Sequence, residues 1–363
     1  MADKADKKYI ELALKLAEKA RGKTSPNPMV GAVVVKNNRI VGQGYHKKAG
    51  TAHAEKIALN QACNLAKDSI LYVTLEPCCH VGRTDPCTGA IIRAGVKKVV
   101  YSIKDPNPIV NGCGIRCLKK AGIEVTGNVM AKQARRLNEV YLKYITTGRP
   151  FVVLKMAQSI DGRIATSTGH SQWISGQASL KFAHRLRSYY DAVVIGAGTV
   201  KADNPNLTVR LTKGNNPYRI ILSQNPEFAK NINLFKHNND CKTIVATSAG
   251  PADKLKIKNL TVWKIEKNRG NKNRLSLTDF LDKAGRFGIT SILVEGGSGL
   301  ATSFIREHLV DKFHFIMAPM IIGGGLDAIS DLGIRHLDKA LRFKEYEVEK
   351  IGEDCLFTGY LEG

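Results

Sequence analysis

Apolar residues in the first half of the chain recur at spacings that alternate between helix and strand. A helical spacing begins near Ile10, and Gly22 suits the end of that helix. Runs rich in β-branched residues at 30–35 and 40–45 flank an Asn-Asn pair, which predicts a hairpin. The pattern further predicts helices at 53–66, from Cys87, near 114–121 and near 130–146, and strands at 70–75, 98–103 and 123–126.

The order of these elements, β-β-α-β-α-β-α-β-α, implies a sheet covered by helices on both faces, with parallel neighbours after the hairpin. A linker at 146–150 follows, and a new strand pattern starts at 151–157. No internal repeat relates the two halves, so the second half is a different domain. We expect two α/β domains, at residues 1–147 and 150–363.

The net charge of the chain helps to decide which kind of ligand it binds. The 363 residues include 55 Lys and Arg against 32 Asp and Glu, a formal net charge of +23. The basic residues occur as scattered pairs, such as Lys47-Lys48 and Lys97-Lys98, without interleaved aromatic residues. This distribution favours solvated faces or the attraction of phosphorylated small molecules over nucleic-acid binding.

Apolar runs and cysteines indicate the compartment. No stretch approaches the roughly 20 apolar residues that span a bilayer, and the first residues lack the apolar segment of a signal peptide. Eight cysteines in a chain of this length do not form a disulfide scaffold. We therefore expect a cytoplasmic protein with no membrane partner and with reduced cysteines.

The stretch 53–87 carries the strongest chemical signal. It begins His53-Ala54-Glu55 at a predicted helix start and ends Glu-Pro-Cys-Cys-His-Val-Gly-Arg-Thr-Asp-Pro-Cys. One imidazole and two thiolates make a tripodal Zn²⁺ site whose fourth position is open to water, and the pKa of that water falls to about 7. Glu55 is free to move a proton, as in the H-x-E…P-C-x-x-C pattern of zinc deaminases. Here, however, eight residues rather than two separate Cys78 from Cys87.

This long loop resembles the deaminase half of the bifunctional riboflavin-biosynthesis deaminase–reductases, which reads approximately H-A-E…E-P-C-x-H-x-G-x-T-P-P-C. The resemblance implies a cytidine-deaminase-like three-layer α/β/α domain in which His53, Cys78 and Cys87 bind zinc and Glu55 is the catalytic acid and base. Cys79 stands where the family commonly has a small polar residue, and Asp85 where it usually has proline. We expect Cys87 to open a helix whose dipole stabilises its thiolate.

Loops around this motif resemble the family's substrate-binding loops. The resemblance implies substrate contacts from Asn27, His46, His80, Arg83, Asp105 and Asn107. Cys113 and Cys117 are also close in sequence, but no further ligands cluster there. We therefore expect a helix-associated pair of thiols and no second metal.

The second half resembles, segment by segment, the reductase domain of the same family, which has a dihydrofolate-reductase-like fold. Its Val-Glu-Gly-Gly-Ser-Gly turn follows a predicted strand at 290–294 and opens a helix, whose free N–H groups suit a pyrophosphate. The resemblance implies NADPH as cofactor. It implies cofactor contacts from Ala157, Trp173, Thr199, Asp203, Gly296, Gly297, Ser298 and Gly299, and substrate contacts from Ser171, Arg187, Leu207, Arg210 and Glu295. Lys155 and Asp203 are the expected catalytic residues.

By this resemblance, the chain deaminates 2,5-diamino-6-ribosylamino-4(3H)-pyrimidinone 5′-phosphate and then reduces the ribosyl group to ribityl with NADPH. We expect a small phosphorylated pyrimidine as substrate, no nucleic-acid partner, and a homo-oligomer, either dimer or tetramer. The alternative is a nucleic-acid cytidine or adenosine deaminase with an appended binding domain. Residues 151–363 lack an RNP1-like aromatic motif and a KH-type loop, which disfavours that alternative.

Overall fold

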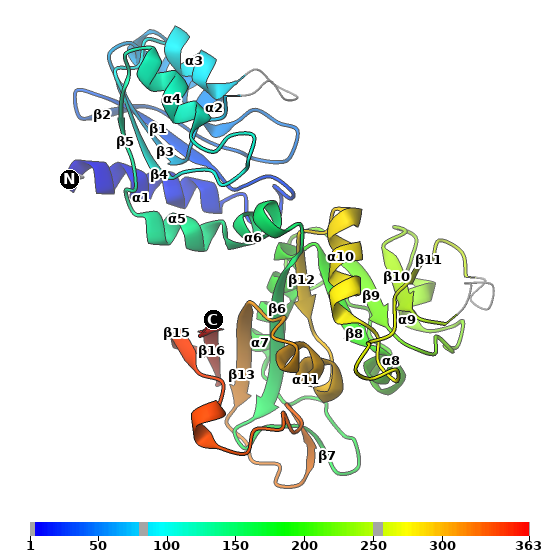
Figure 1. The fold of residues 1–363 in the computed structure, drawn as a ribbon. Helices are drawn as coiled ribbons and strands as arrows, with labels where there is room; N and C mark the ends of the chain where they lie inside the picture. The colour runs from blue at the N-terminus through cyan, green and yellow to red at the C-terminus, as the bar shows by residue number, and fades with distance from the viewer. Residues whose placement is uncertain (1–3, 80–85, 250–256, 363) are drawn as a thin grey trace. The chain divides into compact units, whose positions relative to one another are not determined.

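Two large sheets organise the chain, each at the centre of its own unit, residues 1–148 and 149–363 (Figure 1). The computed structural model describes residues 4–79, 86–249 and 257–362. In this part of the chain no helix is long and apolar enough to cross a membrane.

The first unit contains a five-stranded sheet in the order β2-β1-β3-β4-β5. β1 pairs antiparallel with β2 and β3, whereas β3, β4 and β5 are parallel. The predicted hairpin and the parallel strands after it are therefore confirmed. The strands are β1 (Gly31–Lys36), β2 (Arg39–Tyr45), β3 (Ile70–Leu75), β4 (Lys98–Ile103) and β5 (Glu124–Thr126).

Helices cover both faces of this sheet, as predicted (Figure 1). Ala32 and Val34 of β1 pack toward one set of helices, and Val33 and Val35 pack toward the other. The strand is buried on both faces, so it has a continuous apolar run instead of an alternating one. The helices are α1 (Lys4–Glu18), α2 (Ala54–Ala62), α3 (Cys87–Arg93), α4 (Cys113–Lys120), α5 (Ala131–Leu137) and α6 (Glu139–Thr147).

Two predicted helices differ from the structure. The helix expected at 53–66 turns into a short 3₁₀ helix at Cys63–Ala66. The helix expected at 130–146 is two helices that break at Asn138. The Asn138 side chain accepts a hydrogen bond from Met29 N at 2.8 Å and donates one to Met29 O at 2.9 Å. These bonds to a distant loop account for the break, which helical spacing alone does not reveal.

The second unit contains a nine-stranded sheet in the order β11-β10-β9-β8-β12-β6-β13-β16-β15. It is parallel from β11 to β13, and β16 and β15 continue it antiparallel. The strands are β6 (Phe151–Ser159), β8 (Ala192–Gly196), β9 (Tyr218–Leu222), β10 (Thr243–Thr247), β11 (Thr261–Lys264), β12 (Ser291–Val294), β13 (Lys312–Ala318), β15 (Phe343–Ile351) and β16 (Asp354–Leu361). A separate pair joins β7 (Arg163–Thr166) to β14 (Gly325–Asp327).

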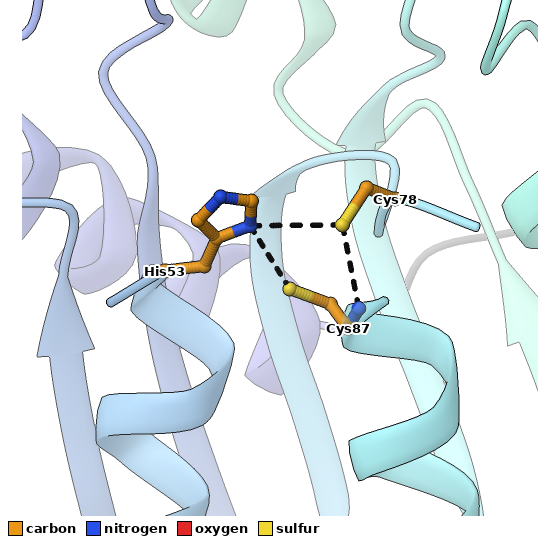
Figure 2. Close-up of side chains that lie close together, drawn as sticks. All are labelled: His53, Cys78 and Cys87. Atoms are coloured by element: carbon orange, nitrogen blue, oxygen red, sulfur yellow. Dashed lines mark hydrogen bonds between the residues drawn. The ribbon is translucent and has the colours of Figure 1, made fainter. Parts of the chain in front are cut away.

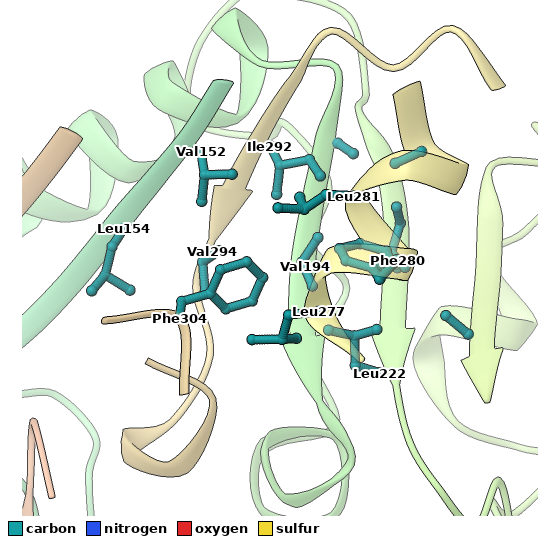
Figure 3. Packing of buried hydrophobic residues seen from close by; sticks show 14 of the residues in the cluster. Val152, Leu154, Val194, Leu222, Leu277, Phe280, Leu281, Ile292, Val294 and Phe304 are labelled. Carbon is teal, nitrogen blue, oxygen red and sulfur yellow. The ribbon is translucent and has the colours of Figure 1, made fainter. Parts of the chain in front are cut away.

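The core of this unit lies between the parallel strands and two helices. Phe280 and Phe304 pack with Val194 and Ile292 of the central strands (Figure 3). In open parallel sheets, ligands bind beyond the carboxyl ends of the strands, so this packing directs attention to the loops after β6, β8 and β12. The helices are α7 (Gln177–Tyr189), α8 (Ala197–Asp203), α9 (Asn233–Lys236), α10 (Leu277–Phe287) and α11 (Ser298–Arg306).

Candidate active sites

His53, Cys78 and Cys87 meet where two helices begin beside the end of β3 (Figure 2). His53 immediately precedes α2, and Cys87 is the first residue of α3. His53 Nδ1 lies 3.1 Å from Cys87 Sγ and 3.6 Å from Cys78 Sγ. Tetrahedral zinc with these ligands requires N–S separations of about 3.6 Å and an S–S separation of about 3.8 Å. The three side chains therefore have the dimensions of a zinc tripod.

The two cysteines of the triad differ in acidity. A hydrogen bond from the Cys87 thiol lowers the pKa of Cys78 to about 4, against the effect of burial and with help from His53. The Cys87 backbone N–H also donates to Cys78 Sγ at 3.3 Å. The pKa of Cys87 is raised by its bond to Cys78 and by burial. Cys87 opens α3, as predicted, and the donors at the start of this helix favour the thiolate form of Cys78. That Cys87 is a thiolate when it binds zinc stays a prediction.

Glu55 lies in the first turn of α2 and is 3% exposed. Among the described residues, its Oε2 atom has no hydrogen-bond partner. Burial raises the pKa of this carboxyl group, which favours a bound proton. Buried polar atoms without partners are rare in folded proteins, so this oxygen indicates a missing ligand beside the thiolates. The donor set and this carboxyl group together fit Zn²⁺.

A cavity of about 510 Å³ adjoins the triad and includes four of the predicted substrate residues, Asn27, His46, Asp105 and Asn107. His46 Nε2 lies 3.2 Å from Asn27 Nδ2, and its Nδ1 lies 3.2 Å from the Ala52 carbonyl. Burial lowers the pKa of His46. The imidazole is therefore neutral, donating to Ala52 and accepting from Asn27. Two further predicted residues, His80 and Arg83, lie outside the described residues.

The residues of this cavity that were not predicted include Glu76 and Tyr141. Tyr141 donates to both Asp105 oxygens, at 2.9 and 3.1 Å, and burial together with that carboxylate raises the pKa of the phenol. The buried Glu76 carboxylate accepts from the backbone N–H groups of Gly112, Ile115 and Asp105 at 2.9, 3.2 and 3.3 Å. Glu76 opens the cysteine-rich motif and could have been singled out. Tyr141 carries no such local signal.

The predicted thiol pair on α4 has a third member. Cys113 forms side-chain hydrogen bonds with both Cys117 and Cys79, and burial raises the pKa of Cys79 to about 12. A Cβ atom at Gly114 would lie 1.9 Å from the Pro77 carbonyl oxygen, so only glycine lets α4 approach this loop so closely. In the described part of the chain, the triad at 53, 78 and 87 is the one group of His, Cys or acidic side chains with metal-binding separations.

Ion pairs organise the second unit's site. Glu295, which follows β12, binds Arg187 of α7 at 2.7 and 2.9 Å and Lys155 of β6 at 3.4 Å. Burial alone would raise the pKa of Glu295, but the two cations hold it at about 2. The structure thus brings together three predicted residues from separate segments. The resulting cluster contains two positive charges and one negative charge.

The glycine turn, residues 296–299, directly follows Glu295 in the sequence. Gly297 N donates to Thr199 Oγ1 at 3.1 Å, which joins the turn to α8. Gly297 precedes α11 without any side-chain cap. Leu300 and Ala301 donate to the Gly297 carbonyl, which leaves the N–H groups of Ser298 and Gly299 for an anion. A second cavity of about 290 Å³ adjoins the turn, and sequence reasoning missed its lining residues Ser223 and Arg274.

The remaining predicted residues of this unit vary in exposure. Trp173 is 69% exposed, and Leu207 is buried with a positive φ of 53°. Ala157 and Ser171 are half-buried. Asp203 is exposed at the end of α8, although partial desolvation of its carboxyl group raises the pKa. Within the described residues, Asp203 makes no ion pair with the Lys155 cluster.

Comparisons with known proteins identify both units. Residues 3–103 match the cytidine and deoxycytidylate deaminase zinc-binding region, and residues 150–357 match the RibD C-terminal domain. The riboflavin biosynthesis protein RibD of Aquifex aeolicus is 46% identical over 359 residues, covering 98% of each chain. A structure of Acinetobacter baumannii RibD is 34% identical, with a TM-score of 0.90 and 99% of each chain covered. A deaminase/reductase structure from Thermotoga maritima is also 34% identical, with a TM-score of 0.85 and the same coverage.

Fold and site thus define a zinc-dependent deaminase joined to a reductase. The chain belongs to the RibD family of riboflavin-biosynthesis enzymes. Membership confirms the predicted fold class, the bifunctional activity and the cofactors Zn²⁺ and NADPH. The alternative of a nucleic-acid deaminase with an appended binding domain is not favoured, because the appended domain is of the RibD type.

Proposed function

We propose that the chain performs two successive steps on one pyrimidine. The unit at residues 1–147 deaminates 2,5-diamino-6-ribosylamino-4(3H)-pyrimidinone 5′-phosphate. The unit at residues 150–363 then reduces the ribosyl group with NADPH, which gives 5-amino-6-ribitylaminouracil 5′-phosphate. The Thermotoga maritima relative supports both steps, since it is a diaminohydroxyphosphoribosylaminopyrimidine deaminase/5-amino-6-(5-phosphoribosylamino)uracil reductase.

In the first step, His53, Cys78 and Cys87 hold the zinc ion. Bound zinc supplies a nucleophilic oxygen at neutral pH by lowering the pKa of water to about 7. Glu55 takes a proton from the attacking water, delivers it to the ring nitrogen and completes the transfer to the leaving amino group. Its burial and its raised pKa suit this exchange, because both favour the protonated carboxyl group that must deliver the proton.

The cavity beside the triad binds the pyrimidine. Asn27 and His46 present an amide and a neutral imidazole, and Asp105 and Asn107 present a carboxylate and a second amide. These groups match the amino and carbonyl edges of a diaminopyrimidinone. We assign His80 and Arg83 to the same substrate by the family pattern.

One observation carries this proposal: three zinc-ligand atoms lie within 4.8 Å of one another beside a buried carboxyl oxygen that lacks a partner. The direct test incubates zinc-loaded protein with the diaminopyrimidine phosphate, first without and then with NADPH. Ammonia release with the deaminated product alone, followed by the ribityl product once NADPH is added, is the expected result. No change in substrate mass under either condition would disprove the proposal.

In the second step, the glycine turn and α11 bind NADPH through Gly296, Gly297, Ser298 and Gly299. Ala157, Trp173, Thr199 and Asp203 complete the cofactor site. Ser171, Arg187, Leu207, Arg210 and Glu295 bind the sugar phosphate. NADPH would supply hydride to C1 of the ribose, and Lys155 with Asp203 supplies the proton that the sugar oxygen or the amine nitrogen takes up as the product forms. The Lys155–Glu295 pair supports this role, because it keeps an ammonium group beside the strand ends.

We also propose a homo-oligomer in the cytoplasm. Tyr346 and Val348 are 63% and 56% exposed on β15, the edge strand of the large sheet. Exposed apolar side chains on an edge strand invite pairing with another chain, and a second copy is the occupant we assign. The eight free cysteines fit a reducing compartment. Sedimentation equilibrium should give a dimer or tetramer, and a Tyr346→Lys variant should shift the mass toward the monomer.

A further inference from the structure

The segment 204–210 crosses the second unit without regular secondary structure, between α8 and β9. Its backbone groups need partners that no strand supplies. Side chains supply three of them at consecutive residues: Arg187 Nη1 donates to Thr208 O at 3.4 Å, Val209 N donates to Asn216 Oδ1 at 2.8 Å, and Arg210 N donates to His184 Nδ1 at 2.9 Å. Side-chain contacts therefore determine the course of this segment.

His184 makes the shorter of the two contacts from α7, where it lies one turn before Arg187 on the same face. The side chain is buried, with 5% of its surface exposed. Its Nδ1 accepts a backbone N–H, so the ring is neutral and carries its proton on Nε2. Burial, together with the charges of Arg187 and Arg210, lowers the pKa of His184 to about 4. The acceptor is therefore present throughout the neutral range.

Arg210, whose backbone N–H donates to His184, carries a positive charge that no acidic side chain among the described residues balances. Glu295 balances Arg187, whereas within the described residues Arg210 makes no ion pair. Its guanidinium donates to Thr208 Oγ1 at 2.9 Å and remains exposed. An exposed guanidinium beside a second arginine suits a phosphate dianion, provided that the backbone holds its side chain in place.

We infer that His184 is a positioning residue, which fixes Arg210 through its backbone N–H so that the guanidinium meets the 5′-phosphate of the sugar substrate. This inference rests on the proposed reduction of the ribosyl phosphate. His184 itself need not touch the substrate, so its loss should weaken phosphate binding without changing hydride transfer. The KM for the phosphorylated intermediate should therefore rise while kcat stays nearly constant.

A pair of isosteric variants tests this inference. His184→Asn keeps an acceptor near the place of Nδ1, whereas His184→Gln moves the acceptor toward the place of Nε2. We expect His184→Gln to raise the KM for the deaminated phosphate intermediate about tenfold, equivalent to about 1.4 kcal/mol, and His184→Asn to stay within about twofold of wild type. The KM for NADPH and the rate of ammonia release should not change in either variant.

The same kinetics with the dephosphorylated intermediate isolate the phosphate contact. Wild type and His184→Gln should have equal KM values for that compound, because it lacks the group that Arg210 binds. Equal KM values for Asn and Gln variants on the phosphorylated intermediate, or an equal loss on the dephosphorylated one, would overturn the positioning role. Failure of wild type itself to oxidise NADPH with the intermediate would instead refute the proposed function.

Discussion

The two units assemble their sites in opposite ways. Beside the zinc triad, Glu55 lies buried with one oxygen lacking any described partner, and the neighbouring cavity encloses about 510 Å³. In the second unit the charged residues already satisfy one another, with Glu295 bound by both Arg187 and Lys155. The first site has a buried carboxyl oxygen without a partner, whereas the second already pairs its buried carboxylate before its ligands bind.

This difference between the sites matches the charge of the ligand that each one binds. Zinc brings charge that thiolates and a buried carboxyl group can use directly, so leaving them unbalanced prepares the site for the metal. NADPH and a sugar phosphate both bring negative charge. A cluster with an excess of one positive charge can receive an anion without first exposing a bare buried cation. The comparison therefore predicts that changes in the first unit act on metal and chemistry, and changes in the second also act on folding.

The largest effect should come from removing one thiolate. Cys78→Ser should lose most of the zinc, and ammonia release should fall by at least about 10³-fold, since the activation of water by the metal disappears. Cys79→Ser is the matched control, because the neighbouring thiol contacts Cys113 and lies outside the triad. Metal analysis and an ammonia assay measure both variants. If Cys79→Ser emptied the site instead, the ligand assignment would be wrong.

Glu55→Gln should keep its zinc and fold but deaminate poorly, because an amide cannot carry the proton. A positioned general acid and base contributes about 10²–10⁴-fold, so ammonia release should fall within that range. Metal content and kcat measured on the same sample separate the proton role from metal binding. Near-normal turnover in a zinc-replete variant would refute it.

Glu295→Gln should destabilise the second unit, because Arg187 and Lys155 lose their buried partner, at a cost of about 3–5 kcal/mol. The pKa of Glu295 is lowered from 4.5 to about 2, so its contribution is complete above pH 4.5 and is lost as pH falls toward 2. The stability gap between wild type and variant should close over that window.

Tryptophan fluorescence during urea unfolding can follow this gap, because both tryptophans, Trp173 and Trp263, belong to the second unit. A gap that stayed constant between pH 6 and pH 3 would show that the carboxylate charge is not what stabilises the cluster.

Lys155→Ala and Asp203→Asn should each reduce NADPH oxidation at least tenfold, about 1.4 kcal/mol of transition-state stabilisation. Ammonia release should remain intact, because both residues belong to the second unit. Rates within twofold of wild type in both variants would assign the proton to another donor, such as water or the substrate amine.

The smallest expected effect is that of zinc removal on the activity of the second unit. Mild zinc removal should abolish deamination, while NADPH oxidation with the supplied intermediate stays within about twofold of normal. The reason is that the described residues of the second unit contain no metal-binding group. Parallel loss of both activities, with the circular dichroism spectrum unchanged, would contradict independent sites.

Sequence was most informative where chemistry depends on local spacing. The triad's three ligands lie at a helix start, a loop and a second helix start, and each position is visible as a motif. The strands of the first unit follow equally from the apolar pattern, because burial on both faces leaves long β-branched runs. Local rules therefore predicted the strands of the first unit and a zinc site, whereas the family resemblance selected Cys78 and Cys87 as ligands and gave the fold of the second unit.

Sequence failed where a residue depends on a distant partner. Tyr141 contacts Asp105 across 36 residues, and Glu295 meets Arg187 across 108. Arg187 and Glu295 were named only through the family resemblance and their ion pair was not predicted, and Tyr141 was missed. The lowered pKa of Cys78 was also not predicted, since it depends on which thiol accepts the N–H donor of α3.

Asn138 has a consequence for backbone dynamics. Its side-chain amide pairs with both the N–H and the C=O of Met29, as a neighbouring strand would pair with a residue in a sheet. Met29 lies in a loop beside the cavity residues Pro28 and Val30, yet its amide proton should exchange with deuterium as slowly as one inside β1. Exchange at that single amide therefore reports whether Asn138, at the break between α5 and α6, stays hydrogen-bonded to the loop beside the cavity.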